Sequence, residues 1–279
     1  MNTWQFITGI IRWLLLFIAV NCEQFNDDRT IEVTGGNRAV DVQYPQYVSN
    51  RTCNAHRLYA LDTHTQYDHF AKERCGRFVS HLIIRRSVIR QIPSNFFIHK
   101  TSFEFLITLK MENVSLKAIQ PNNFENITHL EVLKLMSNQI EYLPAGLFQH
   151  LTALNTVDLS NNLISTIDLD AFRNCANIRQ LQLNHNRLTV LLGDWFRDMK
   201  NIKYVDFSDN AIESDFDGDI FYGASDVQLF LRSNHIKRII SFGSKSERAI
   251  FRLIVLSDNV LRPPYPIIPI GNQSMSVIY

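Results

Sequence analysis

Apolar residues recur along the chain in a fixed pattern that returns about every 24 positions. Six segments follow the order apolar-x-x-apolar-x-apolar-x-x-Asn, with Asp226 as the one polar misfit; their asparagines are Asn138, Asn162, Asn186, Asn210, Asn234 and Asn259. Two weaker copies precede them, with Val114 and Ser87 at the asparagine position. Alternation of apolar and polar residues predicts a short strand with one buried face. The pattern therefore predicts eight strands between about Val79 and Leu261.

A single copy of this pattern cannot bury its apolar face alone. Neighbouring copies must stack and share a continuous core, with their strands parallel along the inside of a curve. The asparagine side chain is expected inside the turn after each strand, where it pairs with backbone groups. A phenylalanine follows about ten residues later, at Phe97, Phe124, Phe148, Phe172, Phe196 and, one residue late, Phe221. We expect these rings to stack as a buried column on the convex side.

The segment 143–151, LPAGLFQHL, is typical of the convex part of extracellular leucine-rich repeats. The chain thus resembles the leucine-rich repeat proteins of the animal Toll, chaoptin and small-proteoglycan type. The irregular first two repeats and the cysteine-poor N-terminal region also resemble the mosquito Plasmodium-responsive leucine-rich repeat immune proteins. This resemblance implies an α/β leucine-rich repeat solenoid (a horseshoe) with a parallel sheet on its concave face. It also implies a recognition protein, acting in innate immunity if the narrower resemblance holds.

Residues 1–22 have the pattern of a secretory signal peptide. An apolar run from Trp13 to Val20 follows Arg12, and cleavage is expected before Glu23. The run is shorter than the roughly 20 residues of a spanning helix, so an uncleaved membrane anchor is the less favoured alternative. We therefore expect a secreted, extracellular chain without a membrane span after cleavage. Four glycosylation sequons agree with this compartment, at Asn50, Asn113, Asn126 and Asn272.

Three cysteines follow the expected cleavage position. Cys53 and Cys75 lie in residues 23–78, just before the first strand, where an open solenoid end needs a cap. A disulfide between them would close a loop of about 20 residues and contribute roughly 3 kcal/mol. Zinc held with nearby histidines is the alternative, disfavoured by the oxidising secretory route. Cys175 aligns with aliphatic core positions, which favours a buried free thiol over an intermolecular disulfide.

Composition and motifs give no sign of catalysis or nucleic-acid binding. The 279 residues carry 28 Lys and Arg against 27 Asp and Glu, so clustered positive charge for nucleic acid is lacking. No hydrolase, zinc-protease, phosphate-binding or dinucleotide-binding motif is present, so we expect no enzyme and no cofactor. The acidic run from Glu213 to Asp219 does not have calcium-loop spacing, and we expect a solvated loop without metal. Asp215 stands at an apolar position, which predicts local irregularity. Residues 262–279 form a Pro-rich tail.

The residues of each strand that point away from the core can be identified because side chains alternate. They are basic in the first repeats, polar and acidic in the middle, and aromatic or aliphatic in the last. The predicted partner-binding residues on the concave face are Arg85, Lys110, Lys134, Asp158, Gln182, Tyr204, Asp206, Phe230 and Arg232. The expected partner is a protein or a glycan. A receptor or adhesion ectodomain and an extracellular matrix protein are the alternatives, and homo- or hetero-oligomers are left open.

Overall fold

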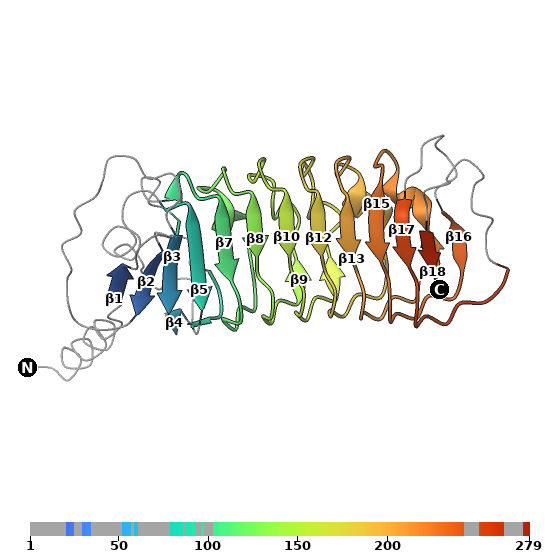
Figure 1. The fold of residues 1–279 in the computed structure, drawn as a ribbon, viewed down its shortest axis with the longest axis horizontal. Helices are drawn as coiled ribbons and strands as arrows, with labels where there is room; N and C mark the ends of the chain where they lie inside the picture. Colours follow the sequence, from blue (N-terminus) through green and yellow to red (C-terminus); the bar gives the residue numbers. More distant parts are fainter. Residues whose placement is uncertain are drawn as a thin grey trace, which may run out of the picture.

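The protein is a solenoid whose strands lie side by side along its long axis (Figure 1). The computed structural model describes residues 79–85, 87–92, 96–97, 103–242, 251–264 and 276–279. It also describes the backbone of four strands nearer the N-terminus: β1 (Asn21–Gln24), β2 (Thr30–Thr34), β3 (Thr52–His56) and β4 (Tyr59–Ala60). One 12-stranded sheet, in the order β1-β2-β3-β5-β7-β8-β10-β12-β13-β15-β17-β18, runs the length of the molecule.

Eight strands of this sheet coincide with the eight predicted repeats. They are β5 (His81–Arg85), β7 (Thr108–Met111), β8 (Val132–Lys134), β10 (Thr156–Asp158), β12 (Gln180–Gln182), β13 (Tyr204–Asp206), β15 (Val227–Phe230) and β17 (Phe251–Val255). Each pairs in parallel with the next, and Thr156 lies opposite both Val132 and Gln180, 24 residues away on either side. The predicted parallel-sheet solenoid is confirmed.

The sheet continues past these repeats at both ends. β3 pairs in parallel with β5, and β2 pairs in parallel with β3. β1 pairs with β2 in the antiparallel direction, unlike the other described strand pairs. At the other end β18 (Ser276–Ile278) pairs in parallel with β17. Residues 1–20 lie outside the described residues, so the signal peptide stays a prediction. β1 spans the predicted cleavage position between Cys22 and Glu23.

The side of the solenoid opposite the sheet, here called the back side, has little helix. It carries the strand pairs β4 with β6 (Val88–Ile89), β9 (Tyr142–Leu143) with β11 (Thr166–Ile167), and β14 (Phe216–Asp217) with β16 (Ile239–Ser241). Among the described residues, this side also carries the short 3-10 helices η2 (Pro121–Phe124), η3 (Gly193–Phe196) and η4 (Gly218–Phe221). The pairing of β14 and β16 shifts register at Phe216, beside Asp215, so the predicted irregularity is confirmed.

The phenylalanine column forms in two segments rather than one. Phe148 stacks between Phe124 and Phe172, with ring centroids 6.4 and 5.5 Å apart. A second segment begins at Phe196, whose ring centroid lies 4.3 Å from that of Phe221. Phe196 also packs edge-on against Phe207, which stands where the preceding strands carry Leu159 and Leu183. Among the described residues, no ring contact joins Phe172 to Phe196, and the column is interrupted between these two turns.

The repeated asparagines hydrogen-bond to the backbone of neighbouring turns, as predicted. In Asn162, Oδ1 accepts from the Ile140 amide at 3.1 Å, and Nδ2 donates to the carbonyls of Leu135 and Leu159 at 3.0 Å. The same arrangement recurs at Asn138, Asn186, Asn210, Asn234 and Asn259. Each asparagine therefore ties its own turn to the preceding turns, and we call the series the asparagine ladder.

One residue before each ladder asparagine, and before Val114 at the equivalent position, the backbone adopts a left-handed conformation. The residues are Asn113, Ser137, Asn161, His185, Asp209, Ser233 and Asp258, with φ between 52° and 59°. Asn, Asp and His tolerate this region better than most residues with a Cβ. The left-handed residue reverses the chain direction at the end of each strand and so brings the following asparagine into the turn.

Candidate binding site on the sheet face

The solvent-facing side of the 12-stranded sheet, here called the sheet face, is the predicted concave face. Parallel register aligns its side chains in rows. One row consists of Lys110, Lys134, Asp158, Gln182, Asp206, Phe230 and Val255, each paired with the next. Residues on either side of this row in each strand, such as Leu133 and Val157, are fully buried. Because the core uses the other side of the strands, this row, apart from the buried Asp158, lies at the surface and is accessible to a partner.

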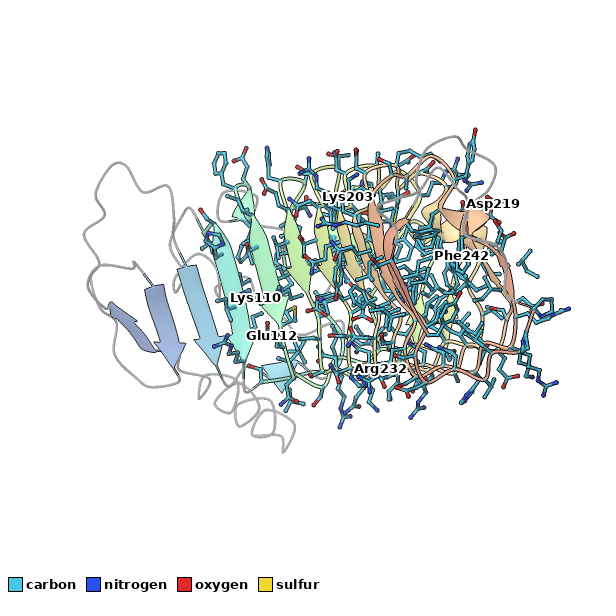
Figure 2. The ribbon with its side chains drawn as sticks, turned by 45° about the vertical axis from the view of Figure 1, so that its right-hand side comes forward. Lys110, Glu112, Lys203, Asp219, Arg232 and Phe242 are labelled. Atoms are coloured by element: carbon cyan, nitrogen blue, oxygen red, sulfur yellow. The ribbon has the colours of Figure 1, made fainter. Side chains whose placement is uncertain are left out.

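The N-terminal end of the sheet face is basic. Lys110 and Lys134 are direct cross-strand neighbours and are half-buried. Arg85 is exposed, and its guanidinium lies 3.9 Å from the Glu112 carboxylate, an ion pair of little energetic weight. Burial and the charge of Lys110 lower the pKa of His81. Figure 2 shows Lys110 and Glu112 together at this end of the sheet.

Asp158 differs from the expectation of an outward, exposed acidic residue. Its side chain lies on the sheet face, but the residue is only 5% exposed. Its Oδ1 accepts hydrogen bonds from the amide of Ser160 at 3.1 Å and from its hydroxyl at 2.6 Å. These bonds hold the carboxylate against the end of its own strand. Asp158 therefore has a structural role, and its charge is largely withdrawn from solvent.

A compact cluster lies further along the face, on β13 and β15. The rings of Tyr204 and Phe230 are neighbours, with centroids 5.1 Å apart and planes inclined by 37°. The Tyr204 hydroxyl donates to Asp206 Oδ2 at 3.4 Å, and Asp206 Oδ1 accepts from the Ser208 amide at 2.9 Å. Burial, and then Asp206, raise the pKa of Tyr204, while a hydrogen bond with Gln182 opposes the rise. We call Tyr204, Asp206 and Phe230 the aromatic–acid cluster.

Beyond this cluster the sheet face becomes apolar. Leu253 and Val255 of β17 are half-buried, and Ile278 of β18, which is 50% exposed, lies beside Val255. Arg232 is exposed and forms an ion pair with Asp258, with 2.9 Å between Nε and Oδ2. The predicted order from basic to polar to apolar is therefore present along the face, with Asp158 as the exception.

Two predicted features lie wholly or partly outside the described residues. Cys53 lies in β3, paired with Leu82, but Cys75 is not among the described residues, so their disulfide stays a prediction. Of the four sequons, Asn113 is exposed in the turn after β7 and Asn126 is half-buried. Asn50 and Asn272 are outside the described ranges. Glycosylation at all four positions stays a prediction.

A polar hollow that the repeat pattern does not predict lies between two neighbouring turns. Asp170, Arg173, Asn174, Arg197 and Asp198 line a cavity of about 390 Å³. Arg197 and Asp170 form an ion pair at 3.0 Å, and the Asn174 amide donates to Asp198 Oδ2 at 2.9 Å. These residues stand at positions that vary from repeat to repeat, so the pattern could not identify them. The side chains of the two turns pair across the hollow, and these contacts join the two turns.

Within the described ranges, no three His, Cys, Asp or Glu side chains are grouped so that they could hold a metal ion. The acidic residues near Asp219 are engaged locally, since Asp217 Oδ1 accepts from the Asp219 amide at 3.0 Å. Asp215 instead pairs with Arg238. The same part of the chain contains no helix of the length and hydrophobicity that crossing a bilayer requires.

Cys175 is buried in the core, as predicted, and is only 3% exposed. Its Sγ lies 3.7 Å from the Arg173 carbonyl oxygen. Burial, and then the charge of Asp198, raise the pKa of the thiol to about 12. The thiolate, which is the reactive form, is therefore scarce at neutral pH.

Native Cys175 is expected to react with iodoacetamide at least about 100-fold more slowly at pH 8 than in the unfolded chain, because burial limits access and the raised pKa lowers the thiolate fraction. The native rate should continue to rise with pH up to the raised pKa, while the unfolded chain levels off near the ordinary thiol pKa of about 8.5. Mass spectrometry of the Cys175 peptide measures both rates, with Cys175→Ser as control. Equal rates, or a Cys175 peptide linked to another chain, would contradict the buried-thiol interpretation.

Comparison with known proteins identifies the repeats. Residues 128–188 and 176–236 each match the family model described as leucine rich repeat. The two matches together contain β8, β10, β12, β13 and β15, and hence the aromatic–acid cluster. No curated protein matches the chain.

Proposed function

Because residues 128–236 are leucine-rich repeats, we propose that the protein is a non-catalytic recognition protein that binds a partner protein through its sheet face. The observation that carries this proposal is the in-register row of side chains from Lys110 to Val255, which the core does not use. Tyr, Phe and Arg are common in protein interfaces, and rigid strands hold them here in fixed positions.

The predicted signal peptide and sequons support an extracellular site of action. A secreted protein of this kind would fit a role in innate immunity, as the resemblance to the mosquito immune proteins suggests. A glycan partner is the second candidate, supported by the amide side chains of Gln180, Gln182 and Gln228 around Tyr204. A receptor ectodomain or a matrix protein would bind its partner through the same face. These alternatives differ from a secreted protein in that the chain is attached to a membrane or to the extracellular matrix.

Two matched double variants test the proposal. Gln180→Arg with Gln228→Arg adds two bulky charges to the sheet face beside Tyr204. Ser165→Arg with Thr189→Arg adds the same charges at exposed positions on the back side. We expect the first variant to lose at least about tenfold in partner capture, because arginine in the interface would clash or remain unpaired. The second should bind as the wild type does.

The measurement is affinity capture of extracellular proteins by the full chain, quantified by mass spectrometry against both variants. Enzymatic removal of glycans from the captured fraction distinguishes a protein partner from a glycan partner. Equal capture by the sheet-face variant and the wild type would refute the sheet face as the binding site. A loss confined to the back-side variant would place the site there instead.

A further inference from the structure

We propose that the aromatic–acid cluster of Tyr204, Asp206 and Phe230 is a recognition site for a cationic side chain, an arginine or a lysine, of the partner protein. This inference rests on the proposed function and assigns the chemistry of one position on the sheet face. It goes beyond general protein binding because it states which residue type the partner must present.

The geometry places one negative charge beside two aromatic rings. Asp206 and Phe230 are direct cross-strand neighbours, and Tyr204 lies two residues before Asp206 on the same face. The rings are 5.1 Å apart, and the Tyr204 hydroxyl touches the Asp206 carboxylate. All three side chains are half-buried. A guanidinium or ammonium group placed at the carboxylate would therefore lie close to the faces of the rings.

Within the described residues, the Asp206 carboxylate has no cationic partner. In the described part of the chain, no Lys, Arg or His nitrogen lies within 4.0 Å of its carboxylate oxygens. The nearby cations are engaged elsewhere, because Lys203 donates to the Ser225 carbonyl and Arg232 pairs with Asp258. A carboxylate accepts about four hydrogen bonds. Asp206 accepts one from Tyr204 and one from the Ser208 amide, so acceptor capacity remains for an incoming donor.

A cation interacts favourably with both the carboxylate and the aromatic rings of such a cluster. A carboxylate forms charge-assisted hydrogen bonds with guanidinium and ammonium groups. Aromatic faces attract the same groups through the ring quadrupole, more strongly when water is excluded. The backbone bond to Ser208 and the hydrogen bond from Tyr204 fix the carboxylate, so little ordering is required on binding. An acidic side chain in the same position would face like charge.

The chain offers a matched control on its back side. Tyr142 donates to Asp168 Oδ2 at 3.4 Å, and Asp168 Oδ1 accepts from the amide two residues on, as Asp206 Oδ1 does. In the described residues, no second aromatic ring contacts Tyr142. This pair therefore has the carboxylate and the tyrosine but lacks the partner ring and the sheet-face location.

The experiment measures binding of short peptides to the full chain by saturation-transfer nuclear magnetic resonance. The peptides are Ac-Gly-Ser-Xaa-Ser-Gly-NH2, with Xaa as arginine, lysine, citrulline or glutamate. Citrulline has the shape of arginine without its charge. We expect the arginine peptide to bind about fivefold more tightly than the citrulline peptide, and the glutamate peptide not to bind. The trisaccharide mannotriose serves as the glycan probe.

Three variants locate the effect. Asp206→Asn retains an acceptor for the Ser208 amide but removes the charge, and it should abolish the preference for arginine over citrulline. Phe230→Leu should weaken arginine binding about threefold while keeping the face apolar. Asp168→Asn should change nothing. Thermal unfolding of each variant shows that the fold is retained.

Equal binding of arginine and citrulline, or an arginine preference that survives Asp206→Asn, would overturn the inference. Binding of mannotriose in place of the cationic peptides would overturn it in favour of a glycan site. If these results occur while the sheet-face double variant still loses partner capture, the proposed function stands and only the cationic assignment fails. If partner capture is also unaffected, both fail.

Discussion

Replacement of Phe148 by alanine is expected to lower the free energy of unfolding by about 3–5 kcal/mol. Phe148 is 1% exposed and is the middle ring of the stacked segment, in contact with Phe124 and Phe172. Its removal deletes two ring contacts and leaves a cavity between two turns. Neighbouring turns cannot collapse into it easily, because the sheet fixes their spacing.

Urea denaturation followed by circular dichroism measures this effect. Phe105→Ala is the control, because Phe105 is 48% exposed and its ring centroid lies 6.2 Å from that of His129. We expect the control to change stability by less than about 1 kcal/mol. A loss at Phe148 no larger than that of the control would show that the column does not support the core.

Replacement of Asn162 by alanine is expected to lower the free energy of unfolding by about 1–3 kcal/mol. The side chain is buried and satisfies the Ile140 amide and the carbonyls of Leu135 and Leu159. Alanine leaves the Ile140 amide without its partner, and a buried unsatisfied group costs about 1–3 kcal/mol. The carbonyls of Leu135 and Leu159 lose one donor each but keep the bonds from Asn138 and Asn186. Because the bonds reach two turns, cooperativity between turns should weaken as well.

Hydrogen exchange of the Ile140 amide and urea denaturation test this expectation together. Asn184→Ala is the matched control, since Asn184 is half-buried on the sheet face and its side chain makes no hydrogen bond to any described residue. The Ile140 amide should lose protection in Asn162→Ala and keep it in the control. Unchanged protection in Asn162→Ala would mean that the turn is held by other contacts.

The strands and the asparagine ladder could be predicted because they repeat. A position that recurs every 24 residues has the same neighbours in each turn, so its burial follows from the pattern. Cys175 was predicted in this way, since it occupies the place of Leu151 and Met199 in neighbouring turns. The pairings of β2 and β3 were missed because their segments lack the repeated leucines and asparagine.

The aromatic–acid cluster was predicted only as separate residues. The segments Asp158-Leu159-Ser160 and Asp206-Phe207-Ser208 are alike in sequence, and both carboxylates accept a bond from the serine amide. Yet Asp158 is buried while Asp206 is half-buried. The cross-strand neighbours differ, because Asp206 stands beside Phe230 and Asp158 beside Lys134 and Gln182. Such differences depend on which side chains are neighbours in the folded sheet, and these side chains do not repeat from turn to turn.

The asparagine ladder restricts how the length of this protein can change. From Asn138 to Asn234 each ladder residue accepts from an amide 22 residues back along the chain, and Asn259 accepts from one 23 residues back. Insertions or deletions of about a whole turn therefore preserve these partners. Removal of residues 163–186 would join Asn162 to Arg187 with every later strand in phase, whereas removal of half that length would place a ladder asparagine on the back side. Gene duplications and losses of single turns are therefore compatible with the fold. They would move the aromatic–acid cluster relative to the basic end of the sheet face in steps of one strand spacing, about 4.8 Å.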